Sequence, residues 1–525
     1  MKLFLGLDSS TQSLSAVVID LDTGAPVKAM SLNFGKEFPE FSCPQGFLPH
    51  TDPLVRQADP LLWVAALDRL CARLRKEGVP LEQIQGISGS GQQHGTIYLD
   101  AAFATGKVAY DPAADLISAI RPHLTRPTAP IWMDSSTSAE CAEIAKAAGG
   151  AELVRKLSGS PPIERFSGPQ IRKFYKEDPR AYERTGVIHL VSSFMASVLA
   201  GTSVGIDFGD GAGMNLLDLA TGTWHTRLLN ATAPGLKKKL PPAAASATVL
   251  APVSSYFVQK YGFRAGTPVV AWSGDNPCSL IGVGAWEPGT AVISLGTSHT
   301  FFAAMRTPLV DPAGFGHVYG NPAGGFMSLI CFKNGALALE QVRDDFHLDW
   351  SKVESLLAAT PAGNNGNMIL PYFVPEITPV VLDAKPVYEG TPAFREGRDA
   401  GAMVRAVVES QAIRLRLYSG WMGKPPAVVR VTGGASANRS LCQTLADVFS
   451  ARVERLTTGN SAALGAAIMA AQAVSKVSWL ELTQAFCKAI PDGDLEPVPD
   501  NVATYARAIP AFEAFVARHA GAGKQ

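Results

Sequence analysis

The sequence predicts an α/β fold that occurs twice, as two lobes with a cleft between them. The chain has 525 residues, 47% of them hydrophobic, which is too long for one ordinary domain and typical of a compact globular protein. Each half contains a hairpin with a hydroxyl-rich turn and, later, a buried strand that ends in a glycine-rich turn. Proline- and alanine-rich residues 241–252 lie near the middle, so we expect lobes over 1–262 and 263–525.

The first half begins with an expected meander of three strands followed by a helix. We expect strands over residues 2–7, 14–20 and 27–30, a helix over 60–78, and another strand over 84–88. Asp59 is a candidate N-cap for the helix, Pro60 suits the first helical position, and Gly78 ends it. The strand at 84–88 leads into the glycine-rich stretch 89–95.

The second half repeats this pattern. We expect a strand over 267–272, a hairpin from 291–295 and 300–304, a helix over 403–418, a strand over 428–431, a helix over 440–449, a strand over 452–456, and helices from 461 and over 501–519. Between the first strand and the hairpin, Asn276 is a natural N-cap, because Pro277 would then occupy the first position of a helix.

Charge and hydropathy exclude several classes of partner. Lys plus Arg and Asp plus Glu number 46 each, which argues against nucleic acid or an anionic membrane surface. The apolar run 462–473 is too short to span a membrane, and the first residues read as a strand, not a signal peptide. The seven cysteines are scattered singly, as expected of reduced thiols in the cytoplasm. The sequence does not reveal the oligomeric state, and a homodimer is one possibility.

Three turns have the composition of phosphate-binding sites: residues 6–13, 296–298 and 433–438. Glycines let backbone N–H groups converge on phosphate oxygens, and Ser and Thr hydroxyls add donors. Each of these turns taken alone is more often only a turn. Three in one chain, each directly after a buried strand, favour a phosphate ligand.

The commoner nucleotide signatures are absent from the sequence. Gly423 and Lys424 are followed by Pro425, so no phosphate-binding loop of the Gly-Lys-Ser/Thr type is present. The stretch that begins Gly89-Ser90-Gly91 has His94 where a dinucleotide fingerprint has its last glycine. No metalloprotease, structural-zinc or serine-hydrolase motif occurs either.

Two aspartates are candidates for the chemistry of a phosphoryl transfer. Asp275 follows a strand and precedes a helix, where it could be a general base that accepts the proton of a hydroxyl nucleophile. A helix N-terminus would favour its ionised form; the alternative is that it only belongs to the helix cap. Asp8 heads a hydroxyl-rich turn and suits Mg²⁺, held directly or through water. Its alternative role is an Asx-turn.

Three further residues are ambiguous from their surroundings. His94 lies in a polar, glycine-flanked loop after a strand, where a site role and a structural role are equally supported. Arg165 stands beside Phe166, and an exposed arginine is the default there. Trp350 reads as a packing or interface residue, because nothing around it indicates a ligand.

Six segments together resemble the FGGY family of carbohydrate kinases. They occur in the family's order and read LFLGLDSSTQS, GISGSGQQHG, ERFSGPQIRKFY, SGDNPCSLIGVG, SLGTS and VTGGASANR. Two more, LVSSFMASVLAG and DGAGMNLLDL, are similar to the xylulokinase branch and especially to its eukaryotic type. The matches extend from Leu3 to about Ala470, nearly the whole chain.

The resemblance implies two actin-like, ribonuclease-H-like lobes that close on ATP and a sugar. It also implies that the sugar is D-xylulose, phosphorylated on its 5-hydroxyl, and that Asp275 is the catalytic base. Three positions match residues that hold the ketopentose: His94, Arg165 and Asn276. The run GQQHG lacks the Gln-Arg-Glu of glycerol kinases, which counts against glycerol.

The resemblance also implies where Mg²⁺ and ATP bind. The first phosphate and magnesium turn is matched by Asp8, Thr11 and Gln12, with Asp8 nearest the metal, and the second phosphate turn by Thr297. The turn against the adenosine is matched by Gly433, Gly434, Ala435 and Asn438, and Trp350 resembles a nucleotide-contacting tryptophan. His299 departs from the acidic or small residue that is usual there, and the family's second signature is only partly recognisable at 332–340.

Three rival functions stay open at this point. One is a kinase for another sugar or polyol, such as ribulose or gluconate, since stereochemistry is read by a few pocket contacts that the sequence does not reveal. Another is an actin-like ATPase that acts on a protein partner, against which the acid and the imidazole of SGDNP and GQQHG speak. The third is an inactive sugar sensor, which the intact Asp8 and Asp275 disfavour.

Overall fold

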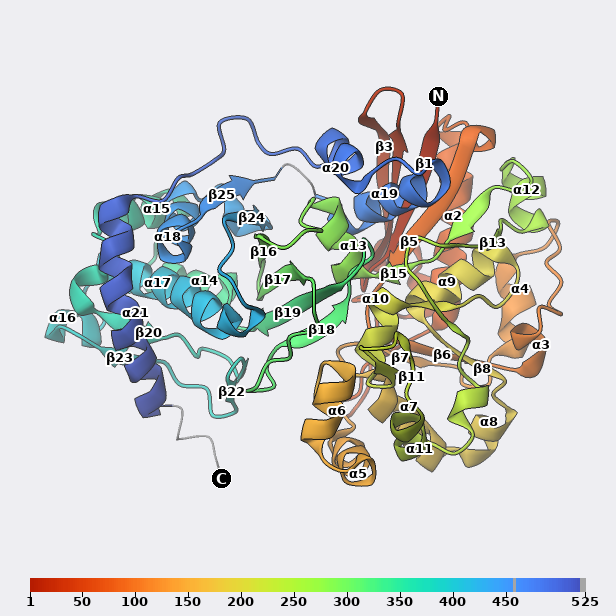
Figure 1. The fold of residues 1–525 in the computed structure, drawn as a ribbon, viewed down its shortest axis with the longest axis horizontal. Helices are drawn as coiled ribbons and strands as arrows, with labels where there is room; N and C mark the ends of the chain where they lie inside the picture. Colours follow the sequence, from red (N-terminus) through yellow and green to blue (C-terminus); the bar gives the residue numbers. More distant parts are fainter. Residues whose placement is uncertain (457–458, 520–525) are drawn as a thin grey trace.

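The computed structural model describes residues 1–456 and 459–519, which form two large β-sheets with helices on their faces (Figure 1). The first sheet has seven strands: β1 (Leu3–Ser9), β2 (Ser13–Asp20), β3 (Ala25–Asn33), β5 (Ile84–Gly91), β13 (Val249–Pro252), β14 (Pro268–Val270) and β15 (Ser273–Gly274). The second has six: β16 (Thr290–Leu295), β17 (His299–Met305), β18 (His317–Gly320), β19 (Phe326–Phe332), β24 (Val428–Thr432) and β25 (Arg452–Arg455). We call the parts built on them the first lobe and the second lobe.

The two sheets share one topology, which confirms the predicted duplication. In the first, β1, β2 and β3 form an antiparallel meander and β5 lies parallel to β1. In the second, β16, β17 and β19 form the meander and β24 lies parallel to β16. Short turns join β1 to β2, β2 to β3 and β16 to β17, whereas β17 and β19 are separated by a segment that contains β18. In both sheets the parallel strand returns only after a long segment. The polar turns 10–12 and 296–298 therefore occupy equivalent places.

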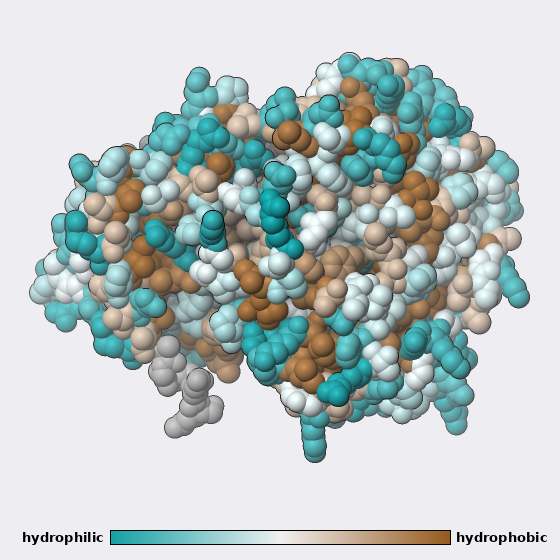
Figure 2. Space-filling model, in the orientation of Figure 1, coloured by the Kyte–Doolittle hydropathy of each residue, from teal (hydrophilic) through white to brown (hydrophobic). Residues whose placement is uncertain are grey.

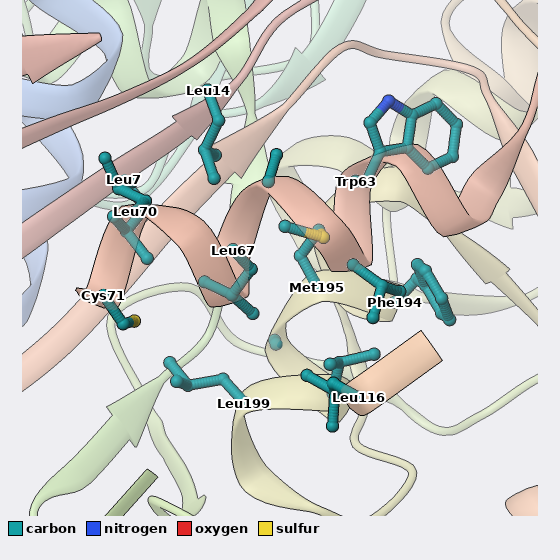
Figure 3. Close-up of a cluster of buried hydrophobic side chains, with 14 of the residues drawn as sticks. Leu7, Leu14, Trp63, Leu67, Leu70, Cys71, Leu116, Phe194, Met195 and Leu199 are labelled. Atoms are coloured by element: carbon teal, nitrogen blue, oxygen red, sulfur yellow. The ribbon is translucent and has the colours of Figure 1, made fainter. Parts of the chain in front are cut away.

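Helices of the first lobe bury its sheet from one side. The principal ones are α2 (Pro60–Lys76), α9 (Val191–Ala200) and α4 (Leu116–Ile120). The predicted helical stripe of α2 is fully buried, and its N-cap Asp59 accepts a hydrogen bond from the backbone of Leu61 at 2.9 Å, as predicted. Figure 3 shows side chains of α2 between Leu7 and Leu14 of the sheet and the side chains of α9. Burying each such leucine stabilises the fold by about 1.5–3 kcal/mol.

The second lobe has its own core. The helices that enclose it are α14 (Ala336–Asp345), α15 (Trp350–Ala359), α17 (Ala400–Ser419), α18 (Arg439–Phe449) and the last helix α21 (Pro499–His519). Helix α17 is central, because it packs against α14, α15, α18 and α21. The last helix lies against the second lobe at the end of the described chain (Figure 1).

Two helices join the lobes through a close backbone crossing. Helices α13 (Asp275–Gly282) and α19 (Ser461–Ser475) pack along each other, and α19 also covers β1 and β5. A Cβ on Gly282 would lie 1.9 Å from the carbonyl oxygen of Ser461, and one on Gly465 would lie 1.8 Å from that of Cys278. Only glycine fits at these two positions, one on each helix, because any side chain would overlap the backbone of the other helix.

The chain crosses between the lobes more than once. Strands β14 and β15 follow residue 262, yet they belong to the first sheet, and α19 returns from the second lobe to cover that sheet. The division of the chain into lobes at 262/263 stays a prediction. The last six residues of the predicted second lobe, 520–525, lie outside the described part of the chain.

One local prediction is wrong. Helix α13 begins at Asp275 with Gly274 as its N-cap, so Asn276 is the second helical residue and Pro277 the third. Proline is tolerated throughout the first turn, because the N–H groups there have no partner within the helix. Pro277 therefore does not mark the first position, and Asp275 is part of the helix.

The surface is mixed in character. On the face shown in Figure 2, apolar side chains are scattered among hydrophilic ones. Among the described residues, no helix has the length and apolarity needed to cross a membrane. All seven cysteines are free thiols.

Candidate active site

The site begins where three neighbouring strands of the first sheet end. Asp8 of β1 pairs with Ser90 of β5, and Ser273 of β15 pairs with the same Ser90 from the other side. These strands are parallel, so their carboxyl ends lie at one edge of the sheet. The next residues, including Asp275 and His94, therefore gather at that edge although they are distant in sequence.

Asp275 lies at the N-terminus of α13 and faces the charge of Asp8. Its Oδ1 accepts hydrogen bonds from the backbone N–H of Asn276 at 2.9 Å and from the Asn276 amide at 3.1 Å. Burial, and then the negative charge of Asp8, raise the pKa of Asp275 to about 7. A carboxyl group with this pKa can exchange a proton near neutral pH, which is the property of a general base.

Asp8 is a second raised carboxyl group. Ser90 Oγ donates to Asp8 Oδ1 at 2.7 Å, and burial raises the pKa of Asp8 to about 6 despite this bond. Among the described residues no cation forms an ion pair with Asp8 or Asp275. Two neighbouring carboxylates without a cation repel each other, so a bound cation would stabilise this pair.

His94 is held as a neutral imidazole. It is buried, its backbone is left-handed with φ of 70°, and its ring stacks on Phe166 with centroids 4.1 Å apart. Nδ1 donates to the carbonyl oxygen of Gly213 at 2.8 Å. Burial, and then the charge of Arg165, lower the pKa of His94 to about 3. Nε2 therefore carries no proton and can accept a hydrogen bond from a ligand hydroxyl.

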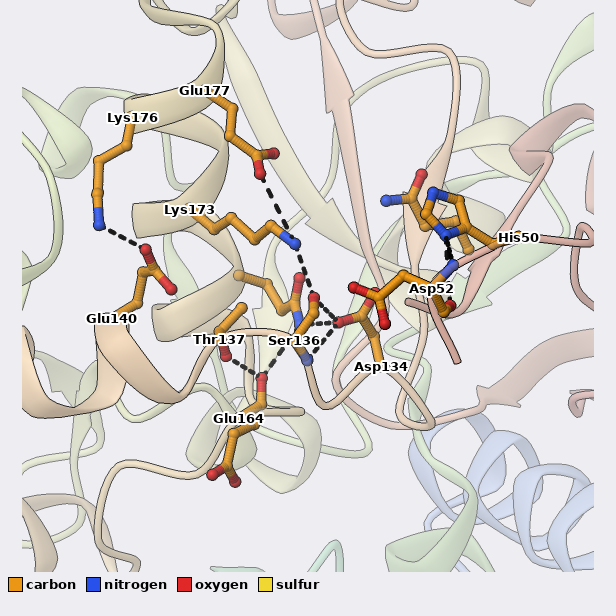
Figure 4. A network of polar contacts seen from close by, with 12 residues as sticks. His50, Asp52, Asp134, Ser136, Thr137, Glu140, Glu164, Lys173, Lys176 and Glu177 are labelled. Atoms are coloured by element: carbon orange, nitrogen blue, oxygen red, sulfur yellow. Dashed lines mark hydrogen bonds and ion pairs between the residues drawn. The ribbon is translucent and has the colours of Figure 1, made fainter. Parts of the chain in front are cut away.

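Arg165 bridges the two lobes. Its Nη2 donates to His317 Nε2 at 3.0 Å, and His317 belongs to β18 of the second sheet. The loop of Arg165 is fixed through the preceding residue, Glu164. The carbonyl oxygen of Glu164 accepts hydrogen bonds from Thr137 Oγ1 at 2.6 Å and from Gln170 Nε2 at 3.1 Å. Figure 4 shows this anchor within a larger polar network around Asp134. A cavity of about 480 Å³ opens between the lobes, lined in part by Arg165 and His317.

Asn276 completes this group. Its amide nitrogen donates to Gln93 Oε1 at 2.9 Å, which ties α13 to the loop of His94. The structure thus brings together Asp8, Asp275, Asn276, His94 and Arg165. Neither Gln93 nor His317 was a sequence candidate; the only signal for Gln93 was its place beside His94.

The first of the three turns expected to bind phosphate lies next to Asp8. Thr11 and Gln12 occupy the turn between β1 and β2, and Trp132 Nε1 donates to Thr11 Oγ1 at 2.8 Å. Thr297 lies in the equivalent turn between β16 and β17 of the second lobe. The neighbouring His299 is buried against Gly335, and burial lowers its pKa to about 4.

The third turn follows β24. Gly433 has φ of 89°, and a Cβ there would lie 2.7 Å from the carbonyl oxygen of Leu295, so the turn requires glycine. Gly434 and Ala435 continue it as a short 3₁₀ turn. Asn438 ends it as the N-cap of α18, since its Oδ1 accepts from the backbone of Leu441 at 2.8 Å.

Trp350 lies on a helix beside this third turn. It is the first residue of α15, its side chain is 46% exposed, and the guanidinium of Arg343 lies 4.7 Å from its ring centroid. One turn further along α15, Glu354 accepts from the backbone N–H of Arg439 at 3.1 Å. Residues four apart share one face of a helix, so Trp350 lies on the side of α15 that faces α18.

The family follows from comparison with known proteins. The model of the FGGY family of carbohydrate kinases, C-terminal domain, matches residues 291–474, and that of the N-terminal domain matches residues 125–282. The chain belongs to this family. The family resemblance of the sequence motifs is therefore confirmed.

Individual relatives cover nearly the whole chain. The xylulose kinase of Mus musculus is 36% identical over 98% of this chain and 94% of its own length. The solved structure of a ligand-bound xylulose kinase from Lactobacillus acidophilus covers 100% of this chain and 99% of its own, with a TM-score of 0.84 and 21% identity. A gluconate kinase structure from the same organism, at 99% of each chain, has the same TM-score and identity. These structures confirm the predicted fold but do not separate the two sugars.

Proposed function

We propose that this protein transfers the γ-phosphoryl group of ATP to the 5-hydroxyl of D-xylulose. The observation that carries the proposal is Asp275, a carboxyl group with a pKa near 7 at a helix N-terminus. It is hydrogen-bonded to Asn276, whose amide in turn binds Gln93, the neighbour of His94. The 36% identity with a xylulose kinase over nearly the full chain favours D-xylulose over other sugars.

In this mechanism the sugar lies between Asp275 and His94. The 5-hydroxyl oxygen forms a bond to the γ-phosphorus, the bond from that phosphorus to the ADP oxygen breaks, and Asp275 takes the hydroxyl proton. His94 Nε2 accepts a hydrogen bond from another sugar hydroxyl, Arg165 donates to a sugar oxygen, and the amide oxygen of Asn276 accepts from a sugar hydroxyl. Asp275 and the sugar are held in one geometry, so positioning supplies much of the rate.

The nucleotide would lie across the three turns. Thr11, Gln12 and Thr297 offer donors to the phosphates, and Gly433, Gly434, Ala435 and Asn438 face the adenosine, with Trp350 beside them. The donor set also suits Mg²⁺, which needs only one or two carboxylates together with water and phosphate oxygens. Asp8 would hold it. Bound there, Mg²⁺ supplies charge neutralisation for the phosphates.

The pH dependence of the reaction follows from the pKa of Asp275. A base must be ionised, and Asp275 is ionised only above a pKa of about 7. We expect kcat/KM for the sugar to fall about tenfold per pH unit below that value and to level off above it. Initial rates from pH 5 to 9 measure this. The residual rate of the Asp275→Asn variant should lack this acid limb; an identical limb in the variant would assign the pKa to another group.

Substrate choice is tested with a panel of acceptors. ADP release is followed by a coupled assay with Mg-ATP and D-xylulose, D-ribulose, L-ribulose, glycerol or gluconate. We expect turnover to be fastest with D-xylulose. Preference for another acceptor would keep the kinase and change its substrate, and ATP hydrolysis independent of any sugar would favour the ATPase alternative.

We place the reaction in the cytoplasm, since seven free thiols suit a reducing compartment.

A further inference from the structure

The second lobe reaches into the sugar site through its edge strand β18. His317 and Tyr319 are two residues apart on this strand, so both side chains point to the same side. Their rings join those of His94 and Phe166 from the first lobe in what we call the interlobe aromatic cluster. The centroid of Tyr319 lies 6.2 Å from that of His94, and the centroid of His317 lies 5.4 Å from that of Phe166.

Strand β18 is fixed in this position by the first lobe. The backbone N–H of Val318 donates to the carbonyl oxygen of Gly159 at 3.2 Å. A Cβ on Gly320 would lie 2.9 Å from the backbone carbonyl carbon of Phe208, so the two backbones approach closely here. The backbone of β18 that carries Tyr319 is therefore held in place by contacts with both lobes.

The hydroxyl group of Tyr319 has no hydrogen-bond partner within the described part of the chain. Tyr319 is fully buried, and its oxygen is among the buried polar atoms without a protein partner. Burial raises the pKa of Tyr319 above its usual value, so the phenol stays protonated. The hydroxyl is thus a protonated donor on a ring whose centroid lies 6.2 Å from that of His94. An unpaired buried hydroxyl is destabilising unless a ligand or water pairs with it.

We propose that the hydroxyl group of Tyr319 binds an oxygen atom of the sugar and is a specificity-determining residue supplied by the second lobe. This inference rests on the proposed function, because it assigns a further contact in the same sugar site. It accounts for the unpaired hydroxyl: the sugar provides the partner that the protein lacks. His317 has a different role, since its Nε2 is already paired with Arg165.

The variant Tyr319→Phe tests this, because it removes one oxygen and leaves the ring in place. Sugar affinity is measured by titration calorimetry with D-xylulose and no nucleotide, so no turnover is needed. We expect the dissociation constant to rise about tenfold, with the KM for ATP unchanged. The thermal midpoint should stay equal or rise, because the unbound protein loses an unpaired polar group. A hydroxyl with a purely structural role would leave sugar affinity unchanged.

A matched control is Tyr256→Phe in the outer part of the first lobe. Tyr256 is equally buried, but its hydroxyl donates to Asp68 at 2.8 Å. Its loss should lower the thermal midpoint and leave sugar affinity as in the wild type. Equal dissociation constants for the wild type and Tyr319→Phe would overturn this inference alone. A wild type that binds no sugar would overturn the proposed function, and this inference with it.

Discussion

Replacing Asp275 by asparagine is expected to lower kcat about 100-fold or more, since a positioned general base contributes roughly 10²–10⁴ to a rate. Asparagine keeps the shape of the side chain but cannot accept the proton of the sugar hydroxyl. The affinity for Mg-ATP should stay nearly unchanged, because the turns that we propose to bind the nucleotide lie on other elements. Stopped assays of ADP formation and a separate nucleotide-binding titration measure the two quantities.

The stability of this variant separates a chemical role from a structural one. Burial and the charge of Asp8 disfavour the ionised form of Asp275, so Asp275→Asn should unfold at the same temperature as the wild type or higher. Asp111→Asn removes the same charge from an exposed turn and should change neither kcat nor stability. Wild-type turnover in Asp275→Asn would eliminate Asp275 as the base.

Replacing Glu376 by alanine is expected to destabilise the second lobe by about 3–5 kcal/mol, the usual effect of leaving a buried charge unpaired. Glu376 and Arg414 form an ion pair at 2.9 Å with side chains 0% and 1% exposed. Burial acts to raise the pKa of Glu376, but Arg414 and the backbone N–H groups of Lys333 and Ile377 hold it below its usual value. Urea unfolding followed by fluorescence measures the loss.

Two controls test whether burial causes this effect. Glu396 pairs with Arg398 on the surface, with side chains 56% and 66% exposed, and Glu396→Ala should cost less than about 1 kcal/mol. The double variant Glu376→Leu, Arg414→Met removes both charges and should be more stable than Glu376→Ala. If Glu376→Ala unfolds like the wild type, the ion pair does not contribute to the stability of the second lobe.

The strands and helices could largely be predicted, because their patterns are local. The meander 2–20 and the hairpin 291–304 alternate around short polar turns, and α2 has both a cap and a helical apolar stripe. The start of α13 could not be predicted, since Pro277 suits any position in a first helical turn. The sequence also does not show to which lobe a segment belongs. The pairing of β14 with β5 joins residues 182 positions apart, and no local pattern encodes it.

Candidate site residues could be proposed where a motif carried them. Asp8, Asp275 and the glycine turns each follow a strand, so spacing marks them as candidates, while their roles are implied by the family resemblance and stay predictions. Tyr319 and His317 could not be identified this way, because β18 is a short buried edge strand without a motif. Their relevance arises only when the second lobe packs against Arg165 and His94.

The measurement that tests the account most directly is nuclear magnetic resonance of the product formed from D-xylulose and Mg-ATP. We predict one new phosphate ester for each ADP formed. Its phosphorus should couple to two protons that also couple to the proton on C4, which identifies the ester as the 5-phosphate. Inorganic phosphate in place of an ester would contradict the proposed transfer to a sugar. An ester at C1 would contradict the placement of the 5-hydroxyl at Asp275.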